Sequence, residues 1–337
     1  MTGFTFHGGR LAEAKGYFGA GDAPWIDLST GINPHGWPGA GTLAVDWQAL
    51  PEVGALNDLE AAAAAFFGTD PAHVCAVPGT EMALRMLGDV LPGPAIHAWP
   101  SYRTHGDMIA GSRAVLLTDL EAEEATVILA NPNNPDGRII PPATLLDWLE
   151  ARSIDGGGNG SASWLVVDEA FADVSPEISL AAFVNDARRL IVFRSFGKFF
   201  GLAGVRLGFV LGPREVIAQY RRRLGSWPLS AAALAVGTAA YRDAEWISAT
   251  RTGLREQAAA LDAVLAKRGF RAMGACPLFR LIAVDDAAAL FERLARASIL
   301  TRPFDYNPRW LRIGLPANGE GLDRLGRALA HDGGADG

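Results

Sequence analysis

The sequence predicts an α/β protein with one large domain and a smaller α+β domain. The chain has 337 residues, of which 49% are apolar, so it can bury a large core and is long enough for two domains. Short apolar runs alternate with segments of helical periodicity. A helical pattern over residues 244–267 is long enough to link two domains. We expect a large domain at residues 42–225, and a second body made of an N-terminal arm, 1–41, with a small domain, 226–337.

In chain order, residues 1–41 are rich in Gly and Pro and show little periodicity, so an extended arm is expected there. Residues 155–161 are expected to form a flexible surface loop. Apolar runs predict strands at 73–77, 126–130, 164–168, 190–193, 278–284 and 310–315. Helical spacing predicts helices at 56–67, 82–91, 142–152, 214–224, 231–241, 244–267, 287–297 and 322–330.

The composition argues against several classes of protein. The net charge of −7 leaves no basic field to attract nucleic acid. Cys75 and Cys276 are far apart and lack a C-x-x-C pattern, which argues against a disulfide framework and a structural zinc site. Residues 1–11 contain Gly, Thr and His where a signal peptide would be apolar, and no run approaches a membrane span. We expect a soluble cytoplasmic protein without nucleic-acid, membrane or metal partners.

The most informative stretch is SFGKFFGLAGVRLGF, residues 195–209. A lysine bracketed by small and aromatic residues would be partly desolvated, which lowers the pKa of its amine and prepares it to form an imine with a carbonyl. The alternative is that Lys198 only extends from a strand end into solvent. Ser195 and Lys198 fit the S-x-x-K of β-lactamases, but no S-D-N or K-T-G follows. A P-loop is excluded by Val192 and Phe199, which replace its first Gly and its Ser or Thr.

Three other positions suggest ligand contacts, although each alone also has a structural interpretation. Residues 78–81, Pro-Gly-Thr-Glu, lead into a helix, and small residues at a helix start leave N–H groups able to bind an anion. Asp168 ends an apolar strand, where α/β sheets place their ligands. Arg312 lies within an apolar strand, where a guanidinium is expensive to bury unless it meets an anion. A capped helix, a turn and a salt bridge are the structural alternatives.

The stretch 195–209 closely resembles the lysine motif of pyridoxal-phosphate enzymes of the aspartate aminotransferase fold, in the class I/II aminotransferase family. The resemblance extends from His7 to Arg312. It implies fold type I, a mostly parallel central sheet flanked by helices plus a smaller α+β domain. It also implies that pyridoxal 5'-phosphate is bound covalently by Lys198, while Ser195 and Arg206 hold the cofactor phosphate.

The same resemblance implies roles for four other segments. Gly79, Thr80 and Glu81 correspond to the turn that cradles the cofactor phosphate. Tyr102 corresponds to the aromatic residue that stacks on the pyridine ring. Asn134, in a loop similar to the family's loop with two Asn-Pro pairs followed by Thr-Gly, would contact the phenolic oxygen; Asp136 replaces the usual Thr of that loop. Asp168 would keep the pyridine nitrogen protonated so that the ring can accept electrons.

The N-terminal arm, with His7-Gly8-Gly9 and Asn33-Pro34, is similar to the segment that reaches the substrate in this family. The family uses the position of Arg312 for the substrate carboxylate, and Arg302 is a second candidate for binding an anion. The resemblance therefore implies substrate contacts from His7, Asn33, Arg302 and Arg312, with a phosphorylated amino acid as the small-molecule substrate.

Within the family, the short length, the arm motifs, the Arg302/Arg312 pair and Phe171 look most like the decarboxylases of threonine phosphate in cobalamin biosynthesis. Histidinol-phosphate aminotransferases, which more often have Tyr at position 171, are the alternative. A sensory domain that binds the cofactor without turnover is a third hypothesis, but residues 1–41 have no room for a DNA-binding module. A homodimer is implied by the resemblance alone, because Leu50 stands where related enzymes often carry a Tyr that reaches the other subunit's cofactor phosphate.

Overall fold

The computed structural model describes residues 3–19, 23–91, 93–120, 125–154 and 163–330, so the loop expected at 155–161 lies outside the described residues. The chain divides into a larger unit, residues 36–251, and a smaller unit made of residues 1–35 and 252–337. This division differs from the expected one because residues 226–251 belong to the larger unit, where α8 (Ala231–Arg242) packs on α2 (Val53–Phe67). Among the described residues, no helix combines the length and apolar character needed to cross a membrane.

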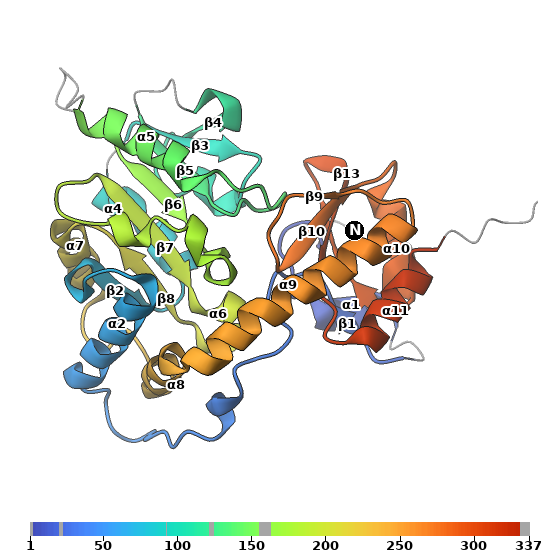
Figure 1. The fold of residues 1–337 in the computed structure, drawn as a ribbon, viewed down its shortest axis with the longest axis horizontal. Helices are drawn as coiled ribbons and strands as arrows, with labels where there is room; N and C mark the ends of the chain where they lie inside the picture. Colours follow the sequence, from blue (N-terminus) through green and yellow to red (C-terminus); the bar gives the residue numbers. More distant parts are fainter. Residues whose placement is uncertain (1–2, 20–22, 92, 121–124, 155–162, 331–337) are drawn as a thin grey trace, which may run out of the picture. The chain divides into compact units, whose positions relative to one another are not determined.

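A seven-stranded sheet forms the centre of the larger unit, in the order β2-β8-β7-β6-β5-β3-β4. Its strands are β2 (Val74–Val77), β3 (Ala95–Trp99), β4 (Arg113–Leu116), β5 (Thr126–Ala130), β6 (Leu165–Asp168), β7 (Leu190–Ser195) and β8 (Gly208–Leu211). Within this sheet β8 runs antiparallel to its neighbours β2 and β7, and the other pairs are parallel. β2 and β8, far apart in the sequence, lie side by side (Figure 1). The predicted mostly parallel sheet is confirmed.

The central strands β5, β6 and β7 are buried at every residue, as expected of parallel strands covered on both faces. The other helices of this unit are α3 (Thr80–Arg85), α4 (Leu87–Val90), α5 (Pro142–Ile154), α6 (Phe196–Phe199) and α7 (Arg214–Leu224). The helix predicted at 82–91 is thus two short helices, which meet at Met86. The predicted bounds of α7 and of α9 (Ala244–Lys267) are confirmed, and α9 contains the boundary between the two units.

The smaller unit is built on an antiparallel sheet of order β12-β13-β10-β9. These strands are β9 (Ala272–Met273), β10 (Phe279–Ala283), β12 (Arg302–Phe304) and β13 (Asn307–Gly314). A parallel pair, β1 (Ile26–Asp27) with β11 (Ile299–Leu300), completes its strands among the described residues. Its helices α1 (Leu11–Phe18), α10 (Ala287–Arg296) and α11 (Gly319–Ala328) give it the predicted α+β character.

The prediction of an extended arm over residues 1–41 is wrong at residues 11–18 and 26–27. Residues 11–18 form α1, and the rings of Phe4 and Phe18 pack on Phe291 of α10 with centroids 5.4 and 6.0 Å apart. Residues 26–27 join a sheet as β1. The sequence pattern did not predict this helix because α1 has only eight residues and Ala14 is its one buried residue, so it lacks a clear apolar periodicity.

Candidate functional site

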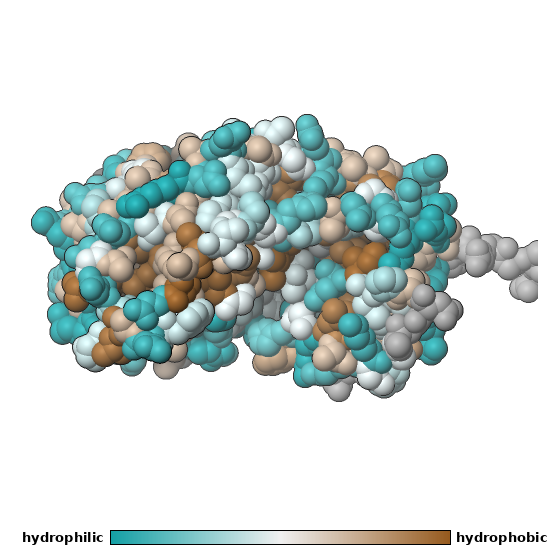
Figure 2. Space-filling view, turned by 90° about the horizontal axis from the view of Figure 1, so that it is seen from below, coloured by the Kyte–Doolittle hydropathy of each residue, from teal (hydrophilic) through white to brown (hydrophobic). Residues whose placement is uncertain are grey.

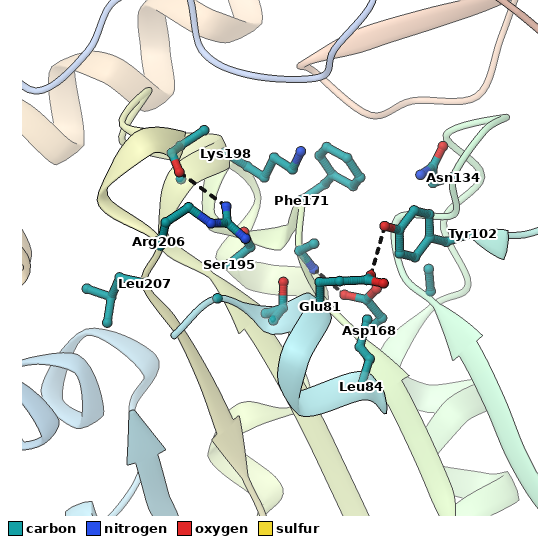
Figure 3. Close-up of a pocket in the computed structure, with 16 residues that line it drawn as sticks. Glu81, Leu84, Tyr102, Asn134, Asp168, Phe171, Ser195, Lys198, Arg206 and Leu207 are labelled. Atoms are coloured by element: carbon teal, nitrogen blue, oxygen red, sulfur yellow. Dashed lines mark hydrogen bonds between the residues drawn. The ribbon is translucent and has the colours of Figure 1, made fainter. Parts of the chain in front are cut away.

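A pocket with a volume of about 190 Å³ lies at the carboxyl ends of β5, β6 and β7 in the larger unit (Figure 3). All of the predicted cofactor-binding residues line it. The lining consists of Gly79, Thr80, Glu81, Leu84, Tyr102, Ala130, Asn134, Asp168, Ala170, Phe171, Ser195, Gly197, Lys198, Ala203, Arg206 and Leu207. The fold therefore brings together side chains from five separate segments of the chain.

Lys198 is presented to the pocket by a one-turn helix that begins directly after β7. Its Nζ lies 5.6 Å from the centre of the Phe171 ring, and Figure 3 shows the side chain pointing toward that ring. Gly197 allows this turn to close, because a Cβ there would lie 2.6 Å from Ala203 Cα. Next to this turn, the buried ring of Phe200 stacks between the rings of Phe196 and Trp246, with centroid distances of 4.6 and 5.6 Å. The aromatic packing holds the lysine-bearing turn in place.

A group of hydrogen-bond donors at one end of the pocket can bind an anion. Arg206 adopts a left-handed backbone conformation with φ 54°, which is uncommon for a residue other than Gly. Gly79, at φ 86°, leaves room for this arginine, because a Cβ there would lie 2.7 Å from Arg206 Nη2. Gly208 similarly admits Thr80, whose backbone N would lie 2.7 Å from an added Cβ. Suitable ligands for a phosphate are present here: the hydroxyls of Thr80 and Ser195, the guanidinium of Arg206, and the backbone N–H groups at the start of α3.

Asp168 is held by two donors at the end of β6. Its Oδ2 lies 3.1 Å from Nε2 of His105, and its Oδ1 accepts a hydrogen bond of 3.0 Å from the backbone N–H of Ala170. The Asp168 and His105 side chains are 8% and 0% exposed, so their interaction is shielded from water. His105 was not predicted from the sequence. Its place in the turn that follows a sheet strand, three residues after Tyr102, is the signal that could have found it.

Glu81 lies on the pocket wall beside Tyr102. The Tyr102 hydroxyl donates to Glu81 Oε2 at 2.9 Å, as the dashed line in Figure 3 shows, and Thr104 and Arg85 also donate to this carboxylate. Burial, and next the charge of Glu81, raise the pKa of Tyr102 to about 12. Tyr102 therefore remains a protonated donor at neutral pH.

The loop after β5 is fixed by side-chain bonds to the backbone. Asn131 donates from Nδ2 to the Ile140 carbonyl at 3.1 Å and accepts at Oδ1 from the Ile140 N–H at 2.9 Å. Asp136, at the position where the family resemblance implies Thr, accepts from Asn133 Nδ2 at 2.8 Å and from the Arg138 N–H at 3.1 Å. The substitution is thus accommodated within the loop that carries Asn134 to the pocket.

Beneath the pocket, a buried ionic network joins β6 to β7. Because side chains alternate along a strand, Glu169 and Arg194 lie on the opposite side from Asp168 and Ser195. Arg194 Nη1 lies 2.7 Å from Glu169 Oε2, and its Nη2 pairs with Asp173. Burial raises the pKa of Glu169 and of Asp173, although Arg194 opposes both shifts. The network fixes the strand ends that carry the two pocket residues.

The predicted substrate residues all belong to the smaller unit. Arg302 and Arg312 face each other across β12 and β13, and like charges placed opposite each other are unfavourable. Arg312 donates to the Ser29 carbonyl at 2.8 Å and lies over the Phe279 ring at 5.0 Å. Burial, and next the charge of Arg302, lower the pKa of Arg312 to about 9. An anion near this pair would relieve the repulsion.

The His7-Gly8-Gly9 motif of the arm lies beside this arginine pair. The Gly9 N–H donates to Ser29 Oγ at 2.7 Å, which joins the His7-Gly8-Gly9 segment to the segment that contacts Arg312. The His7 ring packs edge-on against Phe6 at 4.5 Å, and Arg302 donates to the Phe6 carbonyl at 3.0 Å. Asn33 is buried, and its Oδ1 accepts from the His35 N–H at 2.9 Å.

A family model described as aminotransferase class I and II matches residues 25–328. The chain belongs to this family. A threonine-phosphate decarboxylase of Sinorhizobium sp is 41% identical over 98% of this chain and 99% of its own length. The enzyme of that name from Pseudomonas aeruginosa is 38% identical over 96% of each chain. Among solved structures, a histidinol-phosphate aminotransferase from Sinorhizobium meliloti in complex with pyridoxal-5'-phosphate has a TM-score of 0.78 at 20% identity, covering 95% of this chain and 96% of its own.

The pocket fits pyridoxal 5'-phosphate, the cofactor of the aminotransferase class I and II family. Gly79 leaves room for the Arg206 guanidinium in a cradle of donors that would suit the phosphate, and the Asp168 carboxylate would suit the ring nitrogen. The amine of Lys198, which lines the same pocket, would be available for a covalent bond to the cofactor. Phe171 departs from the family's frequent Tyr, and its ring instead packs against Lys198. Within the described residues, no His, Cys, Asp and Glu side chains group in threes to hold a metal ion.

Proposed function

We propose that this protein is a pyridoxal-phosphate-dependent lyase that decarboxylates L-threonine O-3-phosphate to (R)-1-amino-2-propanol O-2-phosphate for cobalamin biosynthesis. The observation that carries the proposal is the Lys198 pocket, complete with phosphate cradle and Asp168, in a chain that matches two threonine-phosphate decarboxylases over nearly its whole length.

The residues that would hold the cofactor divide by chemical type. Lys198 would bond to its aldehyde carbon, Tyr102 would pack on its ring, and Asn134 would contact its phenolic oxygen. The phosphate would be bound by Thr80, Ser195 and Arg206. When bound, the cofactor supplies a ring that accepts the electron pair left when a bond at the substrate Cα breaks.

Two residues of the pocket would hold or transfer protons during the reaction. Asp168 would hold a proton at the ring nitrogen, and the hydrogen bonds from His105 and Ala170 orient its carboxylate for this role. After CO₂ has left, Cα must gain a proton, and Lys198 Nζ on the pocket wall would deliver it from its protonated, ammonium form.

The substrate would be held at both of its anionic ends by the smaller unit. We assign Arg312 to the carboxylate, since a guanidinium matches a carboxylate with two parallel hydrogen bonds. We assign the phosphate to Arg302, His7 and Asn33. Anchoring the phosphate end of the substrate determines which bond at Cα stands perpendicular to the cofactor ring. A perpendicular Cα–carboxylate bond leads to loss of CO₂.

We further propose a cytoplasmic homodimer. Four large apolar side chains of the larger unit, Trp47, Leu50, Val53 and Trp227, are 76%, 64%, 73% and 58% exposed, and Figure 2 shows apolar side chains among polar ones on this unit. A second copy would cover such a surface. Both cysteines are buried and free, which is consistent with a reducing compartment. Sedimentation over a range of concentrations tests the dimer.

Incubation with threonine phosphate in the absence of any keto acid tests the reaction. Continuous release of CO₂ and aminopropanol phosphate over many turnovers is expected of a decarboxylase. A single half-turnover that resumes only after 2-oxoglutarate is added would indicate an aminotransferase instead, because transamination leaves the amino group on the cofactor.

A further inference from the structure

Two pocket segments that are distant in sequence meet at the carboxylate of Glu81. Glu81 Oε2 accepts hydrogen bonds from the Tyr102 hydroxyl at 2.9 Å and from Thr104 Oγ1 at 3.0 Å. Glu81 Oε1 lies 3.1 Å from Thr104 Oγ1 and accepts from Arg85 Nε at 2.7 Å. One carboxylate therefore connects α3, which starts at the anion cradle, with residues 102–105.

The residues 102–105 form a single turn with two functions. The His105 N–H donates to the Tyr102 carbonyl at 2.9 Å, and the two rings meet edge-on with centroids 5.8 Å apart. His105 in turn contacts Asp168, and Thr104 is buried. A shift of this turn would therefore move both the aromatic face at Tyr102 and the partner of Asp168.

The chemistry of the contact requires a carboxylate. An ionised carboxylate only accepts hydrogen bonds, and it can accept about four, so it satisfies Tyr102, Thr104 and Arg85 together. A glutamine of the same length has one accepting oxygen and two N–H donors, which would oppose one of these three donors. Hydrogen bonds to a charged group are also the stronger kind.

We propose that Glu81 is a positioning residue that fixes the ring-binding turn, 102–105, to the anion-binding start of α3, and so sets the spacing between the sites for the two ends of the cofactor. The inference rests on the proposed function, since it concerns the same pocket. It replaces the expectation that Glu81 contacts the cofactor phosphate, which a carboxylate would repel.

The test is a titration of the apo protein with pyridoxal 5'-phosphate. Glu81→Gln should weaken cofactor affinity roughly tenfold, or about 1.4 kcal/mol, while its unfolding midpoint remains near that of the wild type. Tyr102→Phe should also weaken binding, and the double variant should lose less than the product of the two single losses, because both changes weaken the same Tyr102–Glu81 contact. Arg85→Met is the matched control: this exposed partner should change affinity by less than about twofold.

A second readout separates positioning from stability. At saturating cofactor, the visible circular dichroism of the bound chromophore depends on a fixed ring orientation, and it should fall in Glu81→Gln but not in Arg85→Met. Equal affinity and equal dichroism in Glu81→Gln and the wild type would overturn the inference, as would strictly multiplicative losses in the double variant. If Glu81→Gln does not fold, an unchanged affinity in Tyr102→Phe alone would overturn it. Failure of the wild type to bind the cofactor would overturn the proposed function itself.

Discussion

Replacing Gly79 by Ala tests the phosphate cradle with the smallest possible change. Gly79 has φ 86° and ψ 145°, a conformation that L-residues rarely adopt and that costs them about 1–3 kcal/mol. The new Cβ would lie 2.7 Å from Arg206 Nη2, so the guanidinium must move. The loss of one hydrogen bond from a charged group costs about 1.5–3 kcal/mol. We therefore expect destabilisation of the apo protein and, separately, a cofactor affinity roughly 10 to 100 times weaker.

Gly204→Ala is the control for this prediction. Gly204 lies between Lys198 and Arg206, but its added Cβ would meet nothing within 4 Å, and its φ is not in the left-handed region. Such a substitution typically stabilises a protein by about 0.4–1 kcal/mol through the unfolded chain. Urea unfolding of both apo variants and cofactor titrations provide the comparison. An affinity in Gly79→Ala within threefold of the wild type would refute the assignment of Arg206 to the phosphate.

Lys198→Ala should abolish turnover and borohydride trapping of the cofactor while leaving the unfolding midpoint unchanged, because it removes the covalent link. Arg312→Ala should weaken substrate binding by roughly 3–5 kcal/mol, as when one member of a buried pair is lost; a change below tenfold, ~1.4 kcal/mol, contradicts its role. Asp168→Asn should lower kcat by about a hundredfold, or ~2.7 kcal/mol, with the cofactor still bound. Cys75 and Cys276 should resist thiol reagents at pH 8 in the native protein, because burial raises the pKa of each thiol to about 12; rapid labelling would argue against the core packing.

The cofactor pocket was predictable from sequence because its main residues stand in short, local motifs. Lys198, Ser195 and Arg206 lie within one stretch, and Asp168 ends an apolar strand whose position in a parallel sheet decides which edge it occupies. The helices α7 and α9 were predicted to the residue because their apolar spacing begins and ends at clear polar or Gly boundaries.

The features that the sequence did not predict depend on long-range contacts. His105 reaches Asp168 only because β3 and β6 lie in one sheet, and nothing near it in the sequence identifies Asp168 as its partner. The helix α1 escaped prediction because its stability comes from packing of the aromatic rings around it on Phe291 rather than from its own periodicity. The role of Glu81 likewise appears only when residues 102–105 fold against α3.

The most direct test of the account is to identify the lysine that binds the cofactor. The chain has three lysines, Lys15, Lys198 and Lys267, so borohydride reduction of the cofactor-loaded protein followed by peptide mapping gives an unambiguous answer. We expect the reduced cofactor on the peptide containing Lys198, and we expect prior addition of threonine phosphate to lower this labelling by competing for the same carbon. Recovery of the label on Lys15 or Lys267, or equal labelling of all three lysines, would contradict it.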